Sequence, residues 1–323
     1  MDARNMPLLG VAIPCFNESE TVELCADVVS AVLGNLVAAG KISADSFVVF
    51  VDDGSSDKTW EKIVLLSQRL PVRGIKLAAN VGHQRALLAG LDYCATYTDA
   101  CISMDADLQD DVAAIATMID AYRDGADVVF GVRTDRHADG WWKRNTAQAF
   151  YRLLSAMGVK TVPNHADFRL MSARALTALG EFHERNIYLR GLCASLGFAT
   201  AEVGYCRKVR VAGESKYPLG KMLGLAWDGV TSFSVMPLRL ISFLGVMVFV
   251  GTLLATAWVL YAKFIRLSTM PGWTSTVLPI FFLGGVQLLS LGVLGEYLAK
   301  VYIETKGRPR YIIEEEIDAS ERK

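Results

Sequence analysis

Two long stretches without a charged residue constrain the fold of this chain more than any other feature. The first is Leu240–Ala262 and the second is Leu267–Gly295, whose most apolar part is Val277–Leu294. A helix needs about 20 apolar residues to cross the hydrocarbon core of a bilayer. Helices buried in a soluble core are the alternative, but such helices seldom stay uncharged for so long. We therefore expect transmembrane helices at about 239–262 and 275–298.

The segment Lys263–Thr276, which joins the two most apolar parts, favours a turn because it contains Pro271 and Gly272. The stretches would then form a hairpin whose two outer ends lie on one side of a membrane. The turn carries the basic residues Lys263 and Arg266. More basic residues flank the outer ends, namely Lys216, Lys221, Arg239, Lys300, Lys306, Arg308 and Arg310. Since the side with more basic residues is the cytoplasmic one, we expect both termini in the cytoplasm.

The rest of the chain has the composition of a soluble protein, and its polar start at 1–7 has no apolar signal segment. The net charge of −1 does not favour nucleic acid as a partner. We expect a cytoplasmic domain at 1–216, a juxtamembrane amphipathic segment at 217–237, the hairpin at 238–300 and a cytoplasmic tail at 301–323. In the juxtamembrane segment, apolar residues recur at near-helical spacing, at Leu219, Leu223, Ala226, Val230 and Phe233.

Short β-branched and aromatic segments alternate with helical segments in the first part of the chain. We expect strands at Leu8–Ile13, Phe47–Val51, Gly74–Leu77, Cys101–Met104 and Val128–Val132. We expect helices at Ser19–Ala39, Asp57–Arg69, Gln84–Tyr97 and Val112–Tyr122, with Ser19 and Asp57 as caps. This alternation predicts an α/β fold with a mostly parallel, Rossmann-like sheet and helices on both faces.

Polar residues follow four of the expected strands. They are Asn17-Glu18, Asp52-Asp53, Asn80 and Asp105-Ala106-Asp107. In open α/β sheets, ligands bind beyond the carboxyl ends of the strands. The four groups should therefore meet in one crevice, which predicts a catalytic or nucleotide-binding domain.

Asp105 and Asp107 can face the same side of an extended backbone, and their charges then repel unless a cation neutralises them. Mg²⁺ or Mn²⁺ bridging to substrate phosphates is the usual solution, and Gln109 adds a third oxygen. The alternative is an acidic surface turn that caps a helix. The six cysteines and four histidines lack the spacing of a disulfide framework or a zinc site, so we expect reduced thiols and structural histidines.

Two further segments have ambiguous polar patterns. Asp52–Asp57 could bind a base or ribose, but Asp-Gly and Ser-Ser are also ordinary turn formers. Arg207–Tyr217 contains four cations within ten residues, a hydroxyl and a glycine. Such a loop can bind a lipid phosphate through charge-assisted hydrogen bonds, or can only attract anionic lipid headgroups.

Six motifs occur in the order seen in polyprenyl-phosphate glycosyltransferases of glycosyltransferase family 2, which include dolichol-phosphate mannose synthases. They are Pro14-Cys15-Phe16-Asn17-Glu18, Asp52-Asp53-Gly54-Ser55-Ser56-Asp57, Asn80-Val81-Gly82, Asp105-Ala106-Asp107-Leu108-Gln109-Asp110, Asp167-Phe168-Arg169-Leu170 and Gly213-Glu214-Ser215-Lys216-Tyr217. The chain resembles this family over nearly its whole length. The hairpin, followed by Leu294–Tyr297 and Gly307–Tyr311, is similar to bacterial bactoprenol glucosyltransferases of O-antigen modification. The two prolines that often follow the acidic motif are replaced here by Asp111 and Val112, which puts only the local turn in doubt.

The resemblance implies a GT-A-like fold and a role for each matching residue. The nucleotide pocket would contain Pro14, Asn17, Glu18, Asp53, Ser55, Asn80, Gly82 and Asp105. Mg²⁺ or Mn²⁺ would be held by Asp105, Asp107 and Gln109. Candidates for binding the acceptor or donor phosphates are Arg133, Arg144, Arg207, Arg210, Ser215 and Lys216. Asp167, near the reacting sugar carbon, and Asp107 would be the catalytic residues.

The reaction that the resemblance implies is the inverting transfer of a hexose to undecaprenyl phosphate at the cytoplasmic face of a bacterial inner membrane. Glucose from UDP-glucose is the leading donor, with mannose or another sugar as the alternative. A processive polysaccharide synthase is disfavoured because no Gln-x-x-Arg-Trp segment is present, and a nucleotidyltransferase because no glycine-rich basic entry loop is present. A non-catalytic membrane scaffold or flippase partner is the alternative of another class. A homo-oligomer is left open.

Overall fold

The computed structural model describes residues 4–134, 165–184, 189–206, 236–264 and 272–318. The chain forms two compact units. The first comprises Met1–Ala156, Lys160–Lys216 and Arg308–Lys323, and the second comprises Met157–Val159 and Tyr217–Gly307. The last residues of the chain thus return to the unit formed by the first ones.

An eight-stranded sheet forms the centre of the first unit, in the order β7-β5-β6-β4-β1-β2-β3-β8. The strands are β1 Leu9–Cys15, β2 Phe47–Asp52, β3 Val72–Leu77, β4 Ala100–Ser103, β5 Val128–Arg133, β6 His165–Ser172, β7 Thr200–Tyr205 and β8 Ile313–Ile317. β4, β1, β2 and β3 are parallel neighbours, and β5 is parallel to β7. β6 and β8 are antiparallel to the strands beside them. The expected α/β fold with a mostly parallel sheet is confirmed, in a mixed form.

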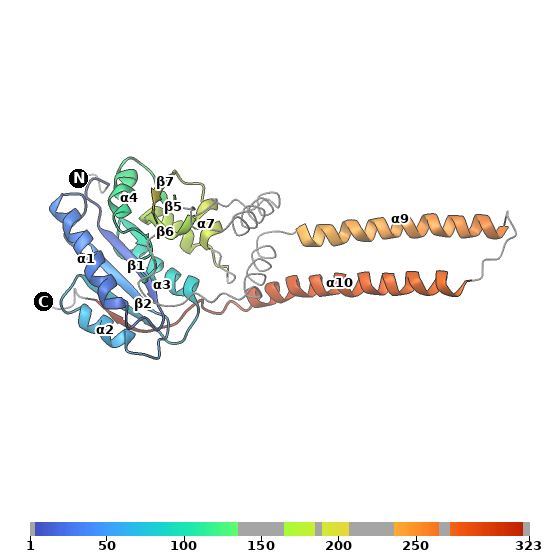
Figure 1. Ribbon diagram of the computed structural model, residues 1–323, viewed down its shortest axis with the longest axis horizontal. Coiled ribbons are helices and arrows are strands. Elements are labelled where there is room, and N and C mark those ends of the chain that lie inside the picture. The colour runs from blue at the N-terminus through green and yellow to red at the C-terminus, as the bar shows by residue number, and fades with distance from the viewer. Residues whose placement is uncertain (1–3, 135–164, 185–188, 207–235, 265–271, 319–323) are drawn as a thin grey trace. The chain divides into compact units, whose positions relative to one another are not determined.

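Helices pack on both faces of this sheet (Figure 1). They are α1 Val22–Ala38, α2 Thr59–Leu66, α3 His83–Tyr97, α4 Ala114–Arg123, α6 Ala173–Gly180 and α7 Leu189–Ser195. Val11 and Ile13 of β1 share one apolar core with α1 and α4. α3 packs on β1, β2 and β4, and a Cβ added at Gly90 would lie 3.1 Å from Ala12 Cβ. Gly90 therefore lets α3 approach the centre of the sheet closely.

The expected elements of the first 133 residues are all present with small shifts of their bounds. The cap at Ser19 is wrong, because α1 begins at Val22 with Thr21 as its N-cap residue. Asp57 lies one residue before the N-cap of α2, and its Oδ1 accepts the Thr59 N–H at 3.0 Å. β6, β7 and β8 are strands that were not predicted from the sequence. The insertion of β6 between β4 and β5 makes the sheet mixed.

The C-terminal strand β8 closes the edge of the sheet at β3. Gly74 pairs with Ile317 and Lys76 with Glu315, and the Ala78 N–H donates to the Ile312 carbonyl at 2.9 Å. Side chains add further contacts to this pairing. The Tyr311 hydroxyl donates to Asp92 Oδ2 at 2.8 Å, Trp60 Nε1 donates to Glu315 Oε2 at 3.1 Å, and Arg73 pairs with Asp318 at 3.2 Å. The end of the expected tail is thus part of the sheet of the first unit.

The second unit contains two long helices that contact each other, α9 Met236–Phe264 and α10 Trp273–Thr305. Among the described residues, one segment is long and apolar enough to cross a membrane, Phe282–Thr305 of α10. Leu238–Val248 of α9 is apolar but shorter. A hairpin that spans the membrane twice therefore stays a prediction.

Candidate functional site

The loops that follow β1 and β2 are joined by hydrogen bonds from main-chain N–H groups to side-chain oxygens. The Asn17 N–H donates to Ser55 Oγ at 2.9 Å, and the Ser56 N–H donates to Asn17 Oδ1 at 2.9 Å. Asn17 reaches this position with a positive φ of 55°, which asparagine tolerates better than most residues. The Glu18 N–H donates to Thr59 Oγ1 at 2.9 Å. Asn17 is exposed, whereas Pro14 is buried within β1.

Asp53 joins the loop after β3 to the end of β2. Its two carboxylate oxygens accept the N–H groups of Val81 at 2.7 Å and Gly82 at 3.0 Å. Burial raises the pKa of Asp53, and these two hydrogen bonds oppose the shift. Gly54 permits the close approach, because a Cβ there would lie 2.8 Å from the Asn80 backbone nitrogen. Asp53 thus shapes the Asn80–Gly82 loop, and its direct contact with a nucleotide stays a prediction.

The acidic loop after β4 presents a carboxylate oxygen without a hydrogen-bond partner. Asp105 Oδ1 is buried and accepts no hydrogen bond, although the whole side chain is 38% exposed. Burial and the nearby carboxylates of Asp167, Asp110 and Asp107 raise the pKa of Asp105 to about 6, against the opposing effect of His83. A divalent cation bound next to Asp105 would stabilise the ionised form of its carboxylate. The residues therefore fit the predicted metal.

The other expected metal ligands lie in the same loop. Asp107 Oδ1 accepts the Gln109 N–H at 3.2 Å, and the Gln109 side chain is largely buried. The described part of the chain has no group of three or more His, Cys, Asp or Glu residues that could hold a metal ion. A cation here would take its remaining ligands from substrate phosphates and water, as Mg²⁺ commonly does.

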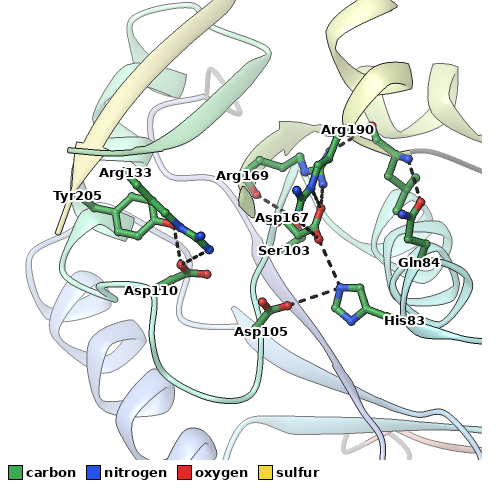
Figure 2. Close-up of polar contacts among 11 residues, drawn as sticks. His83, Gln84, Ser103, Asp105, Asp110, Arg133, Asp167, Arg169, Arg190 and Tyr205 are labelled. Carbon is green, nitrogen blue, oxygen red and sulfur yellow. Dashed lines mark hydrogen bonds and ion pairs between the residues drawn. The ribbon is translucent and has the colours of Figure 1, made fainter. Parts of the chain in front are cut away.

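Asp167, on β6, lies among positively charged groups (Figure 2). Arg169 Nη2 donates to Asp167 Oδ1 at 2.7 Å, and Arg190 donates to both carboxylate oxygens at 3.2 Å. Burial by itself would raise the pKa of Asp167, but the hydrogen bond with His83 and the charges of Arg169 and Arg190 hold it far below its ordinary value. Asp167 is therefore ionised at neutral pH and is a weak base.

His83, expected to be structural like the other histidines, lies within the candidate site. Its Nε2 atom lies 3.5 Å from Asp105 Oδ1 and 3.5 Å from Asp167 Oδ2, as Figure 2 shows. Burial lowers the pKa of His83, but the two carboxylates raise it more, so the net shift is upward. The signal in the sequence was its position directly after Asn80-Val81-Gly82.

Arg133, predicted to bind a phosphate, lies in a second polar cluster. The Tyr205 hydroxyl donates to Asp110 Oδ1 at 2.6 Å, and Arg133 Nε donates to the Tyr205 oxygen at 3.2 Å (Figure 2). Burial and Asp110 raise the pKa of Tyr205, against the opposing effect of Arg133. Arg133 thus has internal partners, and its phosphate role stays a prediction. The other phosphate candidates, Arg144, Arg207, Arg210, Ser215 and Lys216, lie outside the described residues.

Hydrogen bonds and ion-pair contacts thus connect the strand-end residues Asp53 and Asp105 with Asp167, by way of the loop that precedes His83. Residues 10–193 match the profile of glycosyl transferase family 2, and the chain belongs to this family. It is a glycosyltransferase with a GT-A-like α/β fold.

Relatives extend this similarity over the whole chain. The uncharacterized glycosyltransferase YkoT of Bacillus subtilis is 45% identical over 96% of this chain and 92% of its own length. The bactoprenol glucosyl transferase of Shigella phage SfX is 41% identical over 82% of this chain and 87% of its own. Among solved structures, glucosyl-3-phosphoglycerate synthase from Mycobacterium tuberculosis is 16% identical, with a TM-score of 0.44 over 71% of this chain and 79% of that one.

Proposed function

We propose that this enzyme transfers glucose from UDP-glucose to undecaprenyl phosphate, with inversion at the anomeric carbon, and so makes a lipid-linked sugar donor for cell-surface glycans. The observation that supports the site chemistry best is the buried Asp105 oxygen that accepts no hydrogen bond, next to a histidine that also contacts the ionised Asp167. The choice of glucose and of the lipid acceptor rests on the printed names of relatives that are 41% identical.

The acceptor needs little activation by a base. A phosphate monoester has a second pKa of about 6 and is largely a dianion at neutral pH. The depressed pKa of Asp167 agrees with this, because a weakly basic carboxylate is suited to orienting a substrate and not to removing a proton. We therefore assign Asp167 to orientation first and to general-base catalysis second.

The departing nucleoside diphosphate requires more stabilisation than the acceptor. A divalent cation held by Asp105 and Asp107, with Gln109 adding an oxygen, would supply Lewis-acid stabilisation of this leaving group. The hydrogen bonds of Asn17 and Asp53 would hold the surrounding loops in place for the nucleotide. Glu18, Ser55, Asn80 and Gly82 would complete that side of the pocket.

Labelled nucleotide sugars and undecaprenyl phosphate test this proposal with the purified full chain. We expect labelled lipid from UDP-glucose and not from GDP-mannose. If labelled lipid forms from GDP-mannose alone, the enzyme transfers mannose and not glucose. Absence of both lipid product and nucleotide release with any of the sugar nucleotides would favour the scaffold or flippase-partner alternative.

We propose that α9 and α10 cross the cytoplasmic membrane as a hairpin, with the catalytic unit and both termini in the cytoplasm. Several large apolar side chains of the two helices are exposed, which a lipid environment would cover. They include Leu240, Phe243 and Trp258 of α9 and Leu288, Leu291 and Leu298 of α10. The greater number of basic residues at the outer ends of the hairpin supports this orientation.

A cysteine placed at Thr274 should report this orientation. In a background that lacks the six native cysteines, Thr274→Cys should react with a membrane-impermeant thiol reagent added to intact cells. A cysteine at Glu314, on β8, is the matched control and should react only after the membrane is opened. The reverse labelling pattern would contradict the proposed topology.

We propose that the basic loop Arg207–Tyr217 binds the phosphate of the lipid acceptor. Loss of one hydrogen bond to a charged phosphate typically costs about 1.5–3 kcal/mol. Arg210→Ala should therefore raise the apparent KM for undecaprenyl phosphate, or lower turnover at fixed lipid, roughly ten- to hundredfold. Affinity for the nucleotide sugar should change little, because the loop would contact the lipid and not the donor.

Lys221→Ala is the control for this loop, because it removes a cation from the juxtamembrane segment and not from the loop. If both variants weaken the lipid dependence equally, the loop only attracts anionic headgroups. If Arg210→Ala reduces donor binding measured by calorimetry while the lipid titration stays normal, Arg210 belongs to the nucleotide site.

A further inference from the structure

One side chain lies between the two carboxylates that the proposed function assigns to different substrates. His83 Nε2 is 3.5 Å from Asp105, on the acidic loop after β4, and 3.5 Å from Asp167, on β6 (Figure 2). The His83 side chain is 44% exposed and that of Asp167 is 11% exposed. The imidazole is thus partly exposed while it lies within 3.5 Å of both carboxylates.

The position of His83 is fixed by the backbone of the loop that precedes it. His83 is the first residue of α3, directly after Gly82, which has a positive φ of 90°. The N–H groups of Val81 and Gly82 both donate to Asp53, at the end of β2. The place of the imidazole therefore depends on the loop that is predicted to bind the nucleotide.

The next residue of α3, Gln84, contacts α7, the helix that carries Arg190. Gln84 Oε1 accepts the Leu189 N–H at 3.2 Å, at the start of α7. Arg190, the following residue of α7, pairs with Asp167. The first turn of α3 therefore reaches Asp167 twice, directly through His83 and indirectly through Gln84 and α7.

Asp167 and Asp105 differ in the partners that each carboxylate has besides His83. Asp167 also pairs with Arg169 and Arg190, whereas the buried Asp105 oxygen accepts no hydrogen bond. The two 3.5 Å separations are longer than an ordinary N–H···O hydrogen bond of about 2.7–3.2 Å. A single N–H cannot satisfy both acceptors, so a cation bound at Asp105 would leave the His83 N–H to Asp167.

We propose that His83 is a positioning residue that couples the metal-side carboxylate of Asp105 to the orientation of Asp167, and so aligns donor with acceptor. This inference rests on the proposed function, which gives Asp105 and Asp167 their roles. His83 acts here through the two carboxylates and not by contact with the reacting atoms.

Two substitutions separate the N–H donor from the bulk of the side chain. His83→Leu removes the donor but keeps much of the volume, and we expect kcat to fall roughly ten- to hundredfold, as for loss of a hydrogen bond to a charged group. His83→Gln keeps an N–H donor and should recover part of the rate. Thermal unfolding and the calorimetric affinity for UDP with Mn²⁺ should match the wild type for both. His183→Leu, at an exposed histidine after α6, is the control for the substitution itself.

Coupling to Asp167 gives a readout that a general packing role would not produce. If His83 acts through Asp167, the double variant His83→Leu/Asp167→Asn should be no slower than Asp167→Asn alone. Multiplied losses of rate in the double variant would overturn the inference. So would unchanged kcat in His83→Leu, or a loss confined to UDP affinity, which would make His83 a ligand of the donor phosphate.

The wild-type enzyme separates failure of this inference from failure of the proposed function. If the wild type forms no labelled lipid from any nucleotide sugar, the proposed function is wrong whatever the His83 variants do. If the wild type forms lipid and His83→Leu forms it equally fast, only the positioning role is wrong.

Discussion

Asp107→Asn should abolish glycosyl transfer while the protein stays folded. Asp107 Oδ1 accepts the Gln109 N–H, and the side-chain oxygen of asparagine can keep this hydrogen bond. The loop is therefore preserved while the negative charge that would bind the cation is lost. Lewis-acid stabilisation by a metal contributes several kcal/mol to the transition state, so the rate should fall roughly 10²- to 10⁴-fold. Transfer of labelled sugar to lipid measures the rate, and thermal unfolding measures the fold.

Asp111→Asn is the matched control, because it removes a carboxylate from the same loop outside the predicted ligand set. It should retain transfer. Excess EDTA should inactivate the wild type, and added Mg²⁺ or Mn²⁺ should restore it. Full activity of the wild type in excess EDTA would contradict the metal site.

Asp167→Asn should lower both stability and transfer. Arg169 is fully buried, and Asp167 is the carboxylate with which it pairs at 2.7 Å. Removing one partner of a buried ion pair leaves an uncompensated charge and typically costs about 3–5 kcal/mol. Arg190 would also lose its two hydrogen bonds to a charged acceptor. We expect a lower unfolding midpoint and, in the fraction that stays folded, transfer reduced by roughly 10²-fold or more.

Asp127→Asn separates the chemical effect from the structural one. Asp127 is also a fully buried carboxylate that pairs with arginines, Arg4 and Arg174, but it directly precedes β5, at the amino end of that strand. The predicted site is at the carboxyl end. Asp127→Asn should therefore lower the unfolding midpoint without a comparable loss of transfer per folded molecule. If both variants lost transfer only in proportion to folding, Asp167 would have no role in the reaction.

The strand-end motifs were predictable because the signal for each one is local. Asn17, Asp53 and Asp105 each follow a short apolar strand, and the rule for parallel sheets places such residues at one edge. The contacts of His83 with the carboxylates of the site were not predictable. His83 meets Asp105 and Asp167 only because β6 inserts beside β4, and no local pattern indicates that pairing.

β6 and β8 were not predicted because their sequences do not indicate that they are buried or paired. In β6, the fully buried Arg169 reads as a surface residue, because its burial depends on the pairing with Asp167. In β8, three consecutive glutamates read as a solvated tail. The acidic residues in and directly after β8 are stabilised by partners more than 230 residues away in the sequence. These partners are Lys76, Trp60 and Arg73.

The pairing of β8 with β3 also governs when the sheet can be completed during synthesis. β3 ends at Leu77 and β8 begins at Ile313, so the ribosome must make both α9 and α10 before the last strand exists. At about 5–20 residues per second, this interval is on the order of 10–50 s. For that time the edge of β3 is open, and an open edge invites pairing with other chains. If α9 and α10 insert into a membrane as proposed, both helices are available for insertion before the sheet of the first unit can be closed.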